Sequence, residues 1–335
     1  MERPKVQDVA RRAGVGTSTV SRVLNNHPNI SALARERVMT AISELNYSPN
    51  LSARSLRSGQ TSAVSVLLPM TGTAFYTELL EGAQHIFDNA DLDTALFPLV
   101  SGIRIKRYQR PDALLYRADG LLIASLSPDR IYQNQPVPFG KPIILVDAHH
   151  PEYHSVYFDN LAAGQLAAQH ALASGRPIAL IDVAETAGVF ESPVFLERRG
   201  GILQTLSQHG VTPSHSVQVP ISFEDGRQAA RALQDAGLPE RSFVIALCDE
   251  LGLGAMRHFA ESGWTPGQSL HIMGFDGSLE ARKTGLTTIE QPVRQMGAVA
   301  AKLLLEALEG HLNTIQARRF EPTLIELSST QFGRT

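Results

Sequence analysis

The stretch QDVARRAGVGTSTVSRVLN (residues 7–25) decides the architecture of the N-terminal end of this chain. Apolar residues recur at helical spacing on both sides of Gly14, which suits the left-handed cap that ends a helix. Either Gly16 or Thr17 can cap the helix that follows. Two short amphipathic helices separated by a glycine turn are typical of a helix-turn-helix. The residues predicted to share its small core are Val6, Val9, Ala10, Ala13, Val20, Val23 and Leu24.

A third helix and a linker follow this motif. Ser31 is the expected N-cap of the third helix, whose buried stripe is Val38, Ala41, Ile42 and Leu45. It completes a headpiece over residues 1–48, and a hinge and linker follow over 49–62. Pro49 stops regular structure, and residues 50–56 are predicted to form one short helix. Because so short a helix is marginal alone in water, it needs a partner to stabilise it.

Several segments of this N-terminal end carry a family resemblance. They are DVA (8–10), AGV (13–15), TVSRVLN (19–25), LNYSPN (45–50) and ARSL (53–56). The chain resembles the lactose-repressor/galactose-repressor family of bacterial transcription regulators. The resemblance implies a DNA-binding repressor, typically of carbohydrate-utilisation genes, that binds a palindromic operator as a homodimer. It also implies that the second helix enters the major groove and that paired hinge helices enter the minor groove.

The same resemblance implies which residues contact DNA. Thr17 and Ser18 would choose bases, and Arg22 would contact a base edge, that of a guanine. Leu56 would be wedged into a central base step, although it could instead be an ordinary buried hinge leucine. The family usually has serine at the position of Gly16, so Thr17 could serve as the cap instead of reading a base. The remaining predicted DNA-binding residues are Ser21, Asn25, Tyr47 and Asn50, expected mainly at phosphates, with Ala53 and Arg54 in the hinge.

Charge is distributed unevenly along the chain. The whole sequence of 335 residues has a formal net charge of -3, yet residues 1–60 hold nine basic and four acidic residues. Only the N-terminal end is therefore expected to attract a polyanion. A solvated helix face remains the alternative for any one of its polar residues. The single cysteine excludes an intrachain disulfide, and the sequence shows no signal segment or membrane span, so a cytoplasmic protein is expected.

From residue 63 onward, short apolar runs alternate with amphipathic stretches, which predicts parallel sheets covered by helices. We expect an α/β core of two doubly wound, parallel-sheet lobes behind the all-α headpiece. The predicted strands are 63–68, 120–125, 143–147, 155–159, 178–182, 243–247 and 271–275. The predicted helices are 75–90, 160–174, 196–209, 225–236, 251–262 and 292–309.

The core resembles the effector-binding part of the same family, which is similar to a two-lobed periplasmic sugar-binding protein. The matching segments are DGLLIAS (119–125), FDN (158–160), ERRGGI (197–202), CDELGLGAMR (248–257), IMGFDG (272–277) and LTTIEQP (286–292). The resemblance implies three crossovers within a core that spans residues 63–330. Lobe one would then be about 63–160 plus 291–321, and lobe two about 161–290 plus the final strand near 322–330.

Ligands of parallel sheets bind beyond the carboxyl ends of strands, which places a site between the lobes. A sugar needs carboxylates or guanidinium for its hydroxyls and an aromatic face for its C–H surface. Capping or lobe packing could explain some candidates, and Arg198 could instead pair with Glu197. The family commonly has asparagine at Cys248 and often a polar residue at Gly277, so polar recognition can differ here. The predicted effector-binding residues are Phe75, Asp147, Arg198, Phe223, Asp249 and Asp276.

Other classes of function have weaker support. The histidines of HHPEYH (149–154) lie in one loop without a second ligand cluster, so no metal is predicted. GLGAMR (252–257) lacks the glycines of a dinucleotide site, and no cofactor or enzymatic activity is predicted. A carbohydrate-active enzyme would need Asp147 and Asp249 as its pair. A sugar-transport component would not explain the headpiece, and a purine or a protein remains an alternative effector.

Overall fold

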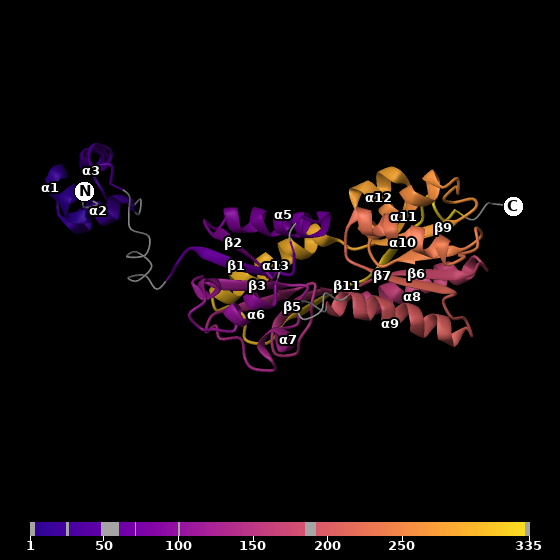
Figure 1. Cartoon of the computed structure of the whole chain (residues 1–335). Coiled ribbons are helices and arrows are strands. Elements are labelled where there is room, and N and C mark those ends of the chain that lie inside the picture. Colours follow the sequence, from indigo (N-terminus) through magenta and orange to yellow (C-terminus); the bar gives the residue numbers. More distant parts are fainter. Residues whose placement is uncertain are drawn as a thin grey trace. The chain divides into compact units, whose positions relative to one another are not determined.

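The structure is a computed structural model that describes residues 4–24, 27–47, 60–70, 72–99, 101–184 and 192–331. The chain forms two compact units, Met1–Thr61 and Ser62–Thr335 (Figure 1). Five of the predicted DNA-binding residues lie outside the described residues, as does the predicted hinge helix. These residues are Asn25, Asn50, Ala53, Arg54 and Leu56.

The first unit is a three-helix headpiece of α1 (Val6–Ala13), α2 (Thr17–Leu24) and α3 (Ala32–Glu44). Gly14 ends α1 with φ 64°, in the left-handed region that favours glycine. The carbonyl oxygen of Gly16 accepts from the amides of Thr19 and Val20, so Gly16 occupies the N-cap position of α2. Ser31 caps α3 by accepting from the amide of Ala34. The predicted apolar stripes meet in one small core.

The second unit contains two six-stranded sheets, one in each lobe (Figure 1). The sheet of lobe one has the order β11-β5-β4-β3-β1-β2, and all its neighbours pair in parallel. Its strands are β1 (Ala63–Leu68), β2 (Asp93–Pro98), β3 (Gly120–Ala124), β4 (Ile143–Val146), β5 (His154–Phe158) and β11 (Ala317–Phe320).

The sheet of lobe two has the order β12-β10-β9-β8-β6-β7. Four of its pairings are parallel, whereas β10 and β12 pair antiparallel because β12 returns from lobe one at the end of the chain. Its strands are β6 (Ile178–Val183), β7 (His215–Val219), β8 (Phe243–Ala246), β9 (His271–Asp276), β10 (Thr287–Glu290) and β12 (Thr323–Ile325).

Alternate residues of the strands point to opposite faces, and helices cover both faces of each sheet. In lobe one, Val64 and Val66 face α5 and α13, whereas Leu67 belongs to the core beneath α6, η1 and α7. In lobe two, Leu180 faces α8 and α9, and Ile181 faces α10 and α11. The helices of lobe one are α5 (Ala74–Asp88), α6 (Gly102–Tyr108), η1 (Leu114–Tyr116), α7 (Pro128–Tyr132) and α13 (Val293–Leu308). Those of lobe two are α8 (Asn160–Ala173), α9 (Pro193–Gln208), α10 (Phe223–Asp235), α11 (Asp249–Glu261) and α12 (Leu279–Thr284).

The chain crosses between the lobes three times, after β5, after β10 and after β11. These crossovers and the predicted α/β architecture are confirmed, as are the seven predicted strands to within one or two residues. β12 lies within the final strand expected near 322–330, whereas the strand prediction omitted β2, β7, β10 and β11. Three of these lie at sheet edges with exposed polar residues, so they lack the continuous apolar run that marked the central strands.

The helix prediction was wrong at several boundaries. It omitted α6, α7 and α12, each of seven residues or fewer. It also began α9 three residues late, because Pro193 stands in the first turn of the helix, after Ser192 as the cap. Pro292 is the N-cap residue of α13 and not its first helical residue.

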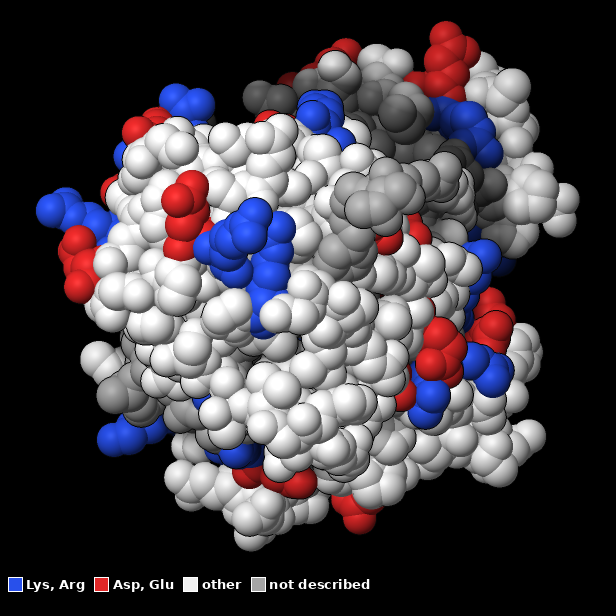
Figure 2. Space-filling model, turned by 90° about the vertical axis from the view of Figure 1, so that its right-hand side faces the viewer, with Lys and Arg blue, Asp and Glu red and all other residues white. Residues whose placement is uncertain are grey.

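No helix in the described part of the chain is long and apolar enough to cross a membrane. On the end of lobe two, basic and acidic side chains are interspersed among uncharged residues (Figure 2). This face contrasts with the headpiece, where basic residues outnumber acidic ones by nine to four over residues 1–60. A polyanion is therefore expected to be drawn to the headpiece and not to this face.

Candidate functional site

The exposed face of α2 is the first candidate site. Thr17, Ser18 and Arg22 are exposed there, and Ser21 is half-buried. Because Gly16 holds the N-cap position, Thr17 is the first helical residue and its side chain is not required as a cap. The face can therefore present hydroxyl groups and a guanidinium to the edges of bases. Tyr47 differs, since it is half-buried and packs against the headpiece core.

The second candidate site is a cleft between the two lobes, with a volume of about 1250 Å³. Lobe one contributes the start of α5 and the ends of β3 and β4. Lobe two contributes α9 and the segments that follow β8 and β9. All six predicted effector-binding residues line this one cleft: Phe75, Asp147, Arg198, Phe223, Asp249 and Asp276.

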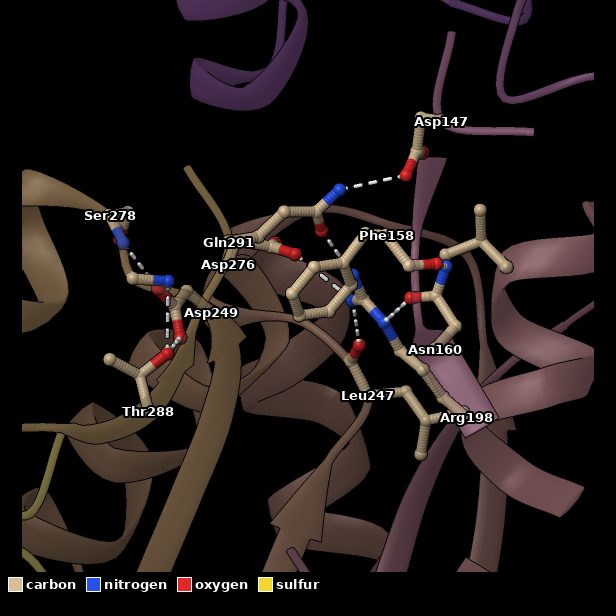
Figure 3. Close-up of polar contacts among 12 residues, drawn as sticks. Asp147, Phe158, Asn160, Arg198, Leu247, Asp249, Asp276, Ser278, Thr288 and Gln291 are labelled. Carbon is tan, nitrogen blue, oxygen red and sulfur yellow. Dashed lines mark hydrogen bonds and ion pairs between the residues drawn. The ribbon is translucent and has the colours of Figure 1, made fainter. Parts of the chain in front are cut away.

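The polar floor of the cleft is formed by Ser125, Asp147, Arg198, Asp249 and Asp276. Arg198 lies at its centre, with a relative exposure of 1% (Figure 3). Its Nη1 donates to the carbonyl oxygen of Leu247 at 2.8 Å and to Oδ1 of Asp276 at 3.0 Å. Its Nε donates to Oδ1 of Asn160, and its Nη2 donates to Oε1 of Gln291, both at 2.8 Å. Four of the five N–H groups of this guanidinium are thus already bonded within the protein.

Gln291 extends this network into lobe one. Its Nε2 donates to Oδ1 of Asp147 at 2.7 Å (Figure 3). Ser125 donates to Oδ2 of the same carboxylate at 2.6 Å. Asn160 and Gln291 both stand at crossovers between the lobes. One hydrogen-bonded chain therefore runs from lobe one through a crossover to Arg198 in lobe two.

Asp249 and Asp276 form a second group of carboxylates on this floor. Oδ1 of Asp249 accepts from the hydroxyl of Thr288 at 2.7 Å, and its Oδ2 accepts from the amide of Ser278 at 2.8 Å. Burial, together with the nearby Asp276 charge, raises the pKa of Asp249. Burial also raises the pKa of Asp276, and the charge of Arg198 opposes this increase. Asp249 follows β8, and its hydrogen bonds thus connect the end of this strand to β10 and to the loop after β9.

Burial likewise raises the pKa of Asp147 to about 6, although the hydrogen bond from Ser125 and the charge of Arg198 lower it.

Three residues of the floor also have unusual backbone angles. Ser125, Asp147 and Asp276 adopt φ values of 52°, 55° and 110°. Such conformations are rare for residues other than glycine and persist only where the surroundings impose them, often at functional sites.

A close helix crossing places Arg198 on this floor. Helices α8 and α9 cross at Gly164 and Gly201, with backbones so near that a Cβ on Gly164 would lie 2.1 Å from the Arg198 carbonyl oxygen. A Cβ on Gly201 would lie 2.2 Å from the carbonyl oxygen of Leu161. Only glycine permits so close an approach of the two helix backbones. The approach places Arg198 beside the segments that cross between the lobes.

Aromatic rings border the polar floor. The Phe275 ring lies beneath the Arg198 guanidinium, with 4.9 Å between the Cζ atom and the ring centroid. Phe75 packs edge-on against Tyr76 with their centroids 5.0 Å apart. Phe223 remains 41% exposed at the start of α10. The cleft can thus bind a ligand that has both hydroxyl groups and an apolar face.

Sequence reasoning missed Ser125, Asn160 and Gln291, whose side chains hold Asp147 and Arg198 in place. All three lie within segments that carried the resemblance, but neutral residues at these positions gave no separate signal.

The histidines of the 149–154 loop contact protein groups in the structure. The ring of His149 packs at a tilt against that of Tyr157, His150 pairs with Asp129, and His154 accepts from the backbone of Gln316. The described residues contain no group of three or more side chains that could hold a metal ion.

Known proteins resemble this chain over nearly its whole length. The repressor PurR of Erwinia tasmaniensis is 28% identical over 98% of this chain and 97% of its own. A structure of a probable transcription regulator from Thermus thermophilus is 38% identical, with a TM-score of 0.68 over 81% of this chain and 99% of its own. The complex of the regulator CelR with cellobiose is 26% identical, with a TM-score of 0.69 over 98% of this chain and 100% of its own.

Two family models match as well. Residues 5–50 match the bacterial regulatory proteins of the lacI family. Residues 61–323 match the periplasmic binding proteins and sugar binding domain of the LacI family. These matches cover the headpiece and most of both lobes. The chain belongs to the LacI family of DNA-binding transcription regulators.

Proposed function

We propose that this chain represses transcription by binding a palindromic operator as a homodimer, and that a sugar in the cleft controls this binding. The observation that carries the proposal is the exposure of Thr17, Ser18 and Arg22 on the second helix of a separately folded headpiece. One headpiece is suited to one half-site, so two copies are needed for a palindrome. The protein would act in the cytoplasm, where its operator is, and no catalytic role is assigned to it.

The roles on DNA follow from the side chains. Thr17 and Ser18 would select bases, and Arg22 would donate to a guanine, which its planar guanidinium fits. Ser21 and Tyr47 would hold phosphates. The residues outside the described ranges complete the proposed interface: Asn25 and Asn50 at phosphates, and Ala53, Arg54 and Leu56 in the minor groove.

The roles in the cleft differ among the six residues. Asp147 and Asp276 would accept hydrogen bonds from sugar hydroxyls, and Phe75 and Phe223 would cover the apolar face of the ring. Arg198 would offer its remaining N–H to the ligand while its other bonds hold the floor together. Asp249 would mainly fix the strand ends, because it accepts from Thr288 on β10 and from Ser278 in the loop after β9.

Control of DNA binding would come from movement of the lobes. A sugar that bonds Asp147 in lobe one and Asp276 in lobe two would favour one arrangement of the lobes over the other. The separation of the two hinge segments in the dimer would then change, and with it the affinity for the operator. The coupling between two such sites is typically about 1–3 kcal/mol. We expect the sugar to release the operator.

Replacement of Arg22 tests the DNA-binding half of this proposal. A DNA sequence is first selected from a random library by the wild-type protein, and its affinity is then measured for Arg22→Ala. The variant should bind about 10- to 100-fold more weakly, since a bidentate base contact is worth about 1–3 kcal/mol. Lys302→Ala, which removes an exposed charge from α13, is the matched control. Equal affinities for Arg22→Ala and the control would contradict the proposal.

A thermal-shift screen tests the effector half. The panel contains mono- and disaccharides, with purine bases as the alternative class. A saturable rise in melting temperature is expected for a sugar, because a ligand of the native state stabilises it. The same compound should weaken binding to the selected DNA. A rise with purines and none with sugars would contradict the sugar effector while leaving the DNA-binding result intact.

A further inference from the structure

Acidic residues outnumber basic residues among the described residues that line the cleft. Among its described lining residues, seven are acidic and three are basic. The basic residues are Arg198, Arg257 and Arg294, and the acidic ones are Glu78, Glu81, Asp147, Asp249, Glu250, Asp276 and Glu280.

Each of the three basic residues is already engaged with a carboxylate. Arg198 bonds Asp276, with 3.0 Å between Nη1 and Oδ1. Arg257 bonds Glu261, with 2.6 Å between Nε and Oε1. Arg294 bonds Glu81 across the crossing of α13 and α5. An anionic ligand would therefore have to share its cation with a carboxylate that stays close to it and repels it.

The carboxylates on the floor are buried as well as numerous. Asp147 is 3% exposed, and Asp276 pairs with the buried Arg198, which is the only basic residue of the described lining on this floor. Water can screen a like charge poorly at such a depth, so a phosphate or carboxylate placed there would be repelled strongly. Neutral hydroxyl groups have the opposite effect, because they donate to carboxylate oxygens.

We propose that the effector is an uncharged sugar, and that the cleft excludes the phosphorylated and carboxylated forms of the same sugar. This inference rests on the proposed effector site and narrows its ligand class. The carboxylates of Asp147 and Asp276 accept from hydroxyl groups, and their charge rejects an acidic group at any position of the ring that reaches the floor. The protein therefore responds to a sugar before phosphorylation or oxidation has added charge to it.

Matched pairs of probes test this proposal on the full-length protein. The pairs are D-ribose with ribose 5-phosphate, D-glucose with glucose 6-phosphate, D-galactose with D-galacturonate, and cellobiose with cellobionate. Affinities come from calorimetry and from the thermal shift. A neutral member should bind, and its acidic partner should bind at least about 100-fold more weakly, since like charges meet in a poorly screened site.

A charge-reversal variant gives a second readout. Glu250 lies at the start of α11 and lines the cleft. Glu250→Lys should strengthen the binding of the acidic partner about tenfold, with less change for the neutral sugar. Glu152→Lys makes the same change of charge at an exposed residue that is not among the lining residues, and it should alter neither affinity.

Three outcomes would overturn the proposal. An acidic member that binds as tightly as its neutral partner would contradict the charge argument. Equal effects of Glu250→Lys and Glu152→Lys would show that the lining charge does not select the ligand. Binding of purines with no binding of any neutral sugar would overturn both the ligand class and the sugar effector. Loss of DNA binding in Arg22→Ala would still be observed in each case, so the two halves of the function can be judged separately.

Discussion

The headpiece carries its predicted functional side chains on the outside of a small apolar core, whereas the core unit buries them between two lobes. Thr17, Ser18 and Arg22 are exposed, and their placement depends only on the local geometry of α2. Arg198 is 1% exposed and bonds residues from positions 160 to 291. In the headpiece, a substitution can therefore change DNA recognition without changing stability. In the cleft, the same hydrogen bonds stabilise the fold and position the ligand-binding groups.

The strongest test of this contrast is the removal of the buried guanidinium. Arg198→Met leaves Asp276 and Asp147 without their shared cation, and breaking a buried pair in this way costs about 3–5 kcal/mol. The free energy of unfolding should fall by that amount. Denaturant unfolding followed by fluorescence measures it, because Trp264 is the only tryptophan and stacks on Phe259 in lobe two.

Arg257→Met is the matched control for this measurement. Arg257 also lines the cleft and pairs with a carboxylate, but its side chain is 64% exposed. An exposed pair contributes about 1 kcal/mol or less, so this variant should stay close to the wild-type protein. Similar small losses in both variants would mean that the floor does not depend on the buried charge.

The pH dependence of stability sharpens the comparison next. The pKa of Asp147 is raised from 3.8 to about 6 by burial. A raised pKa in the folded state means that the protonated carboxyl favours folding. This contribution is fully present below about pH 4 and is lost as the pH rises through about 6. Its size is about 3 kcal/mol, at 1.36 kcal/mol for each pKa unit.

Asp147→Asn isolates this effect. The free energies of unfolding of the two proteins are measured from pH 4 to pH 8 by the same fluorescence assay. The wild-type protein should lose stability relative to the variant as the pH rises through about 6. The other buried carboxylates titrate in both proteins, so most of their contribution cancels in the difference. A difference that stays constant with pH would show that Asp147 is not the group that titrates.

Local spacing allowed the headpiece to be predicted from the sequence. Gly14, Ser31 and the apolar stripes act within a few residues of each other, and the structure confirms each of them. The central strands were predictable for a similar reason, since residues buried on both faces leave continuous apolar runs. Edge strands such as β7 and β11 have no such run, because one side of each remains in water.

The cleft was predictable only in part. Charged and aromatic residues at strand ends, such as Asp147 and Phe223, stand out in a sequence, and the structure brings the predicted six together in one cleft. Gln291 and Asn160 do not stand out, because their importance comes from bonds to Arg198 that form only when two crossovers come together at α9. Contacts between distant segments have no local spacing from which they could be inferred.

The smallest expected effects come from two neighbouring glycines of α9, and they test whether close backbone packing places Arg198. A Cβ on Gly201 would lie 2.2 Å from the Leu161 carbonyl oxygen, whereas a Cβ on Gly200 would be 3.9 Å from the side chain of Leu161. Gly201→Ala should therefore cost about 1–3 kcal/mol through overpacking. Gly200→Ala should be neutral or stabilise the protein by up to about 1 kcal/mol, because alanine favours a helix. Thermal and denaturant unfolding measure both, and opposite signs are expected only if α8 and α9 touch at Gly201. Equal effects would mean that the helices can separate at little cost, and Arg198 would then owe its position to its hydrogen bonds alone.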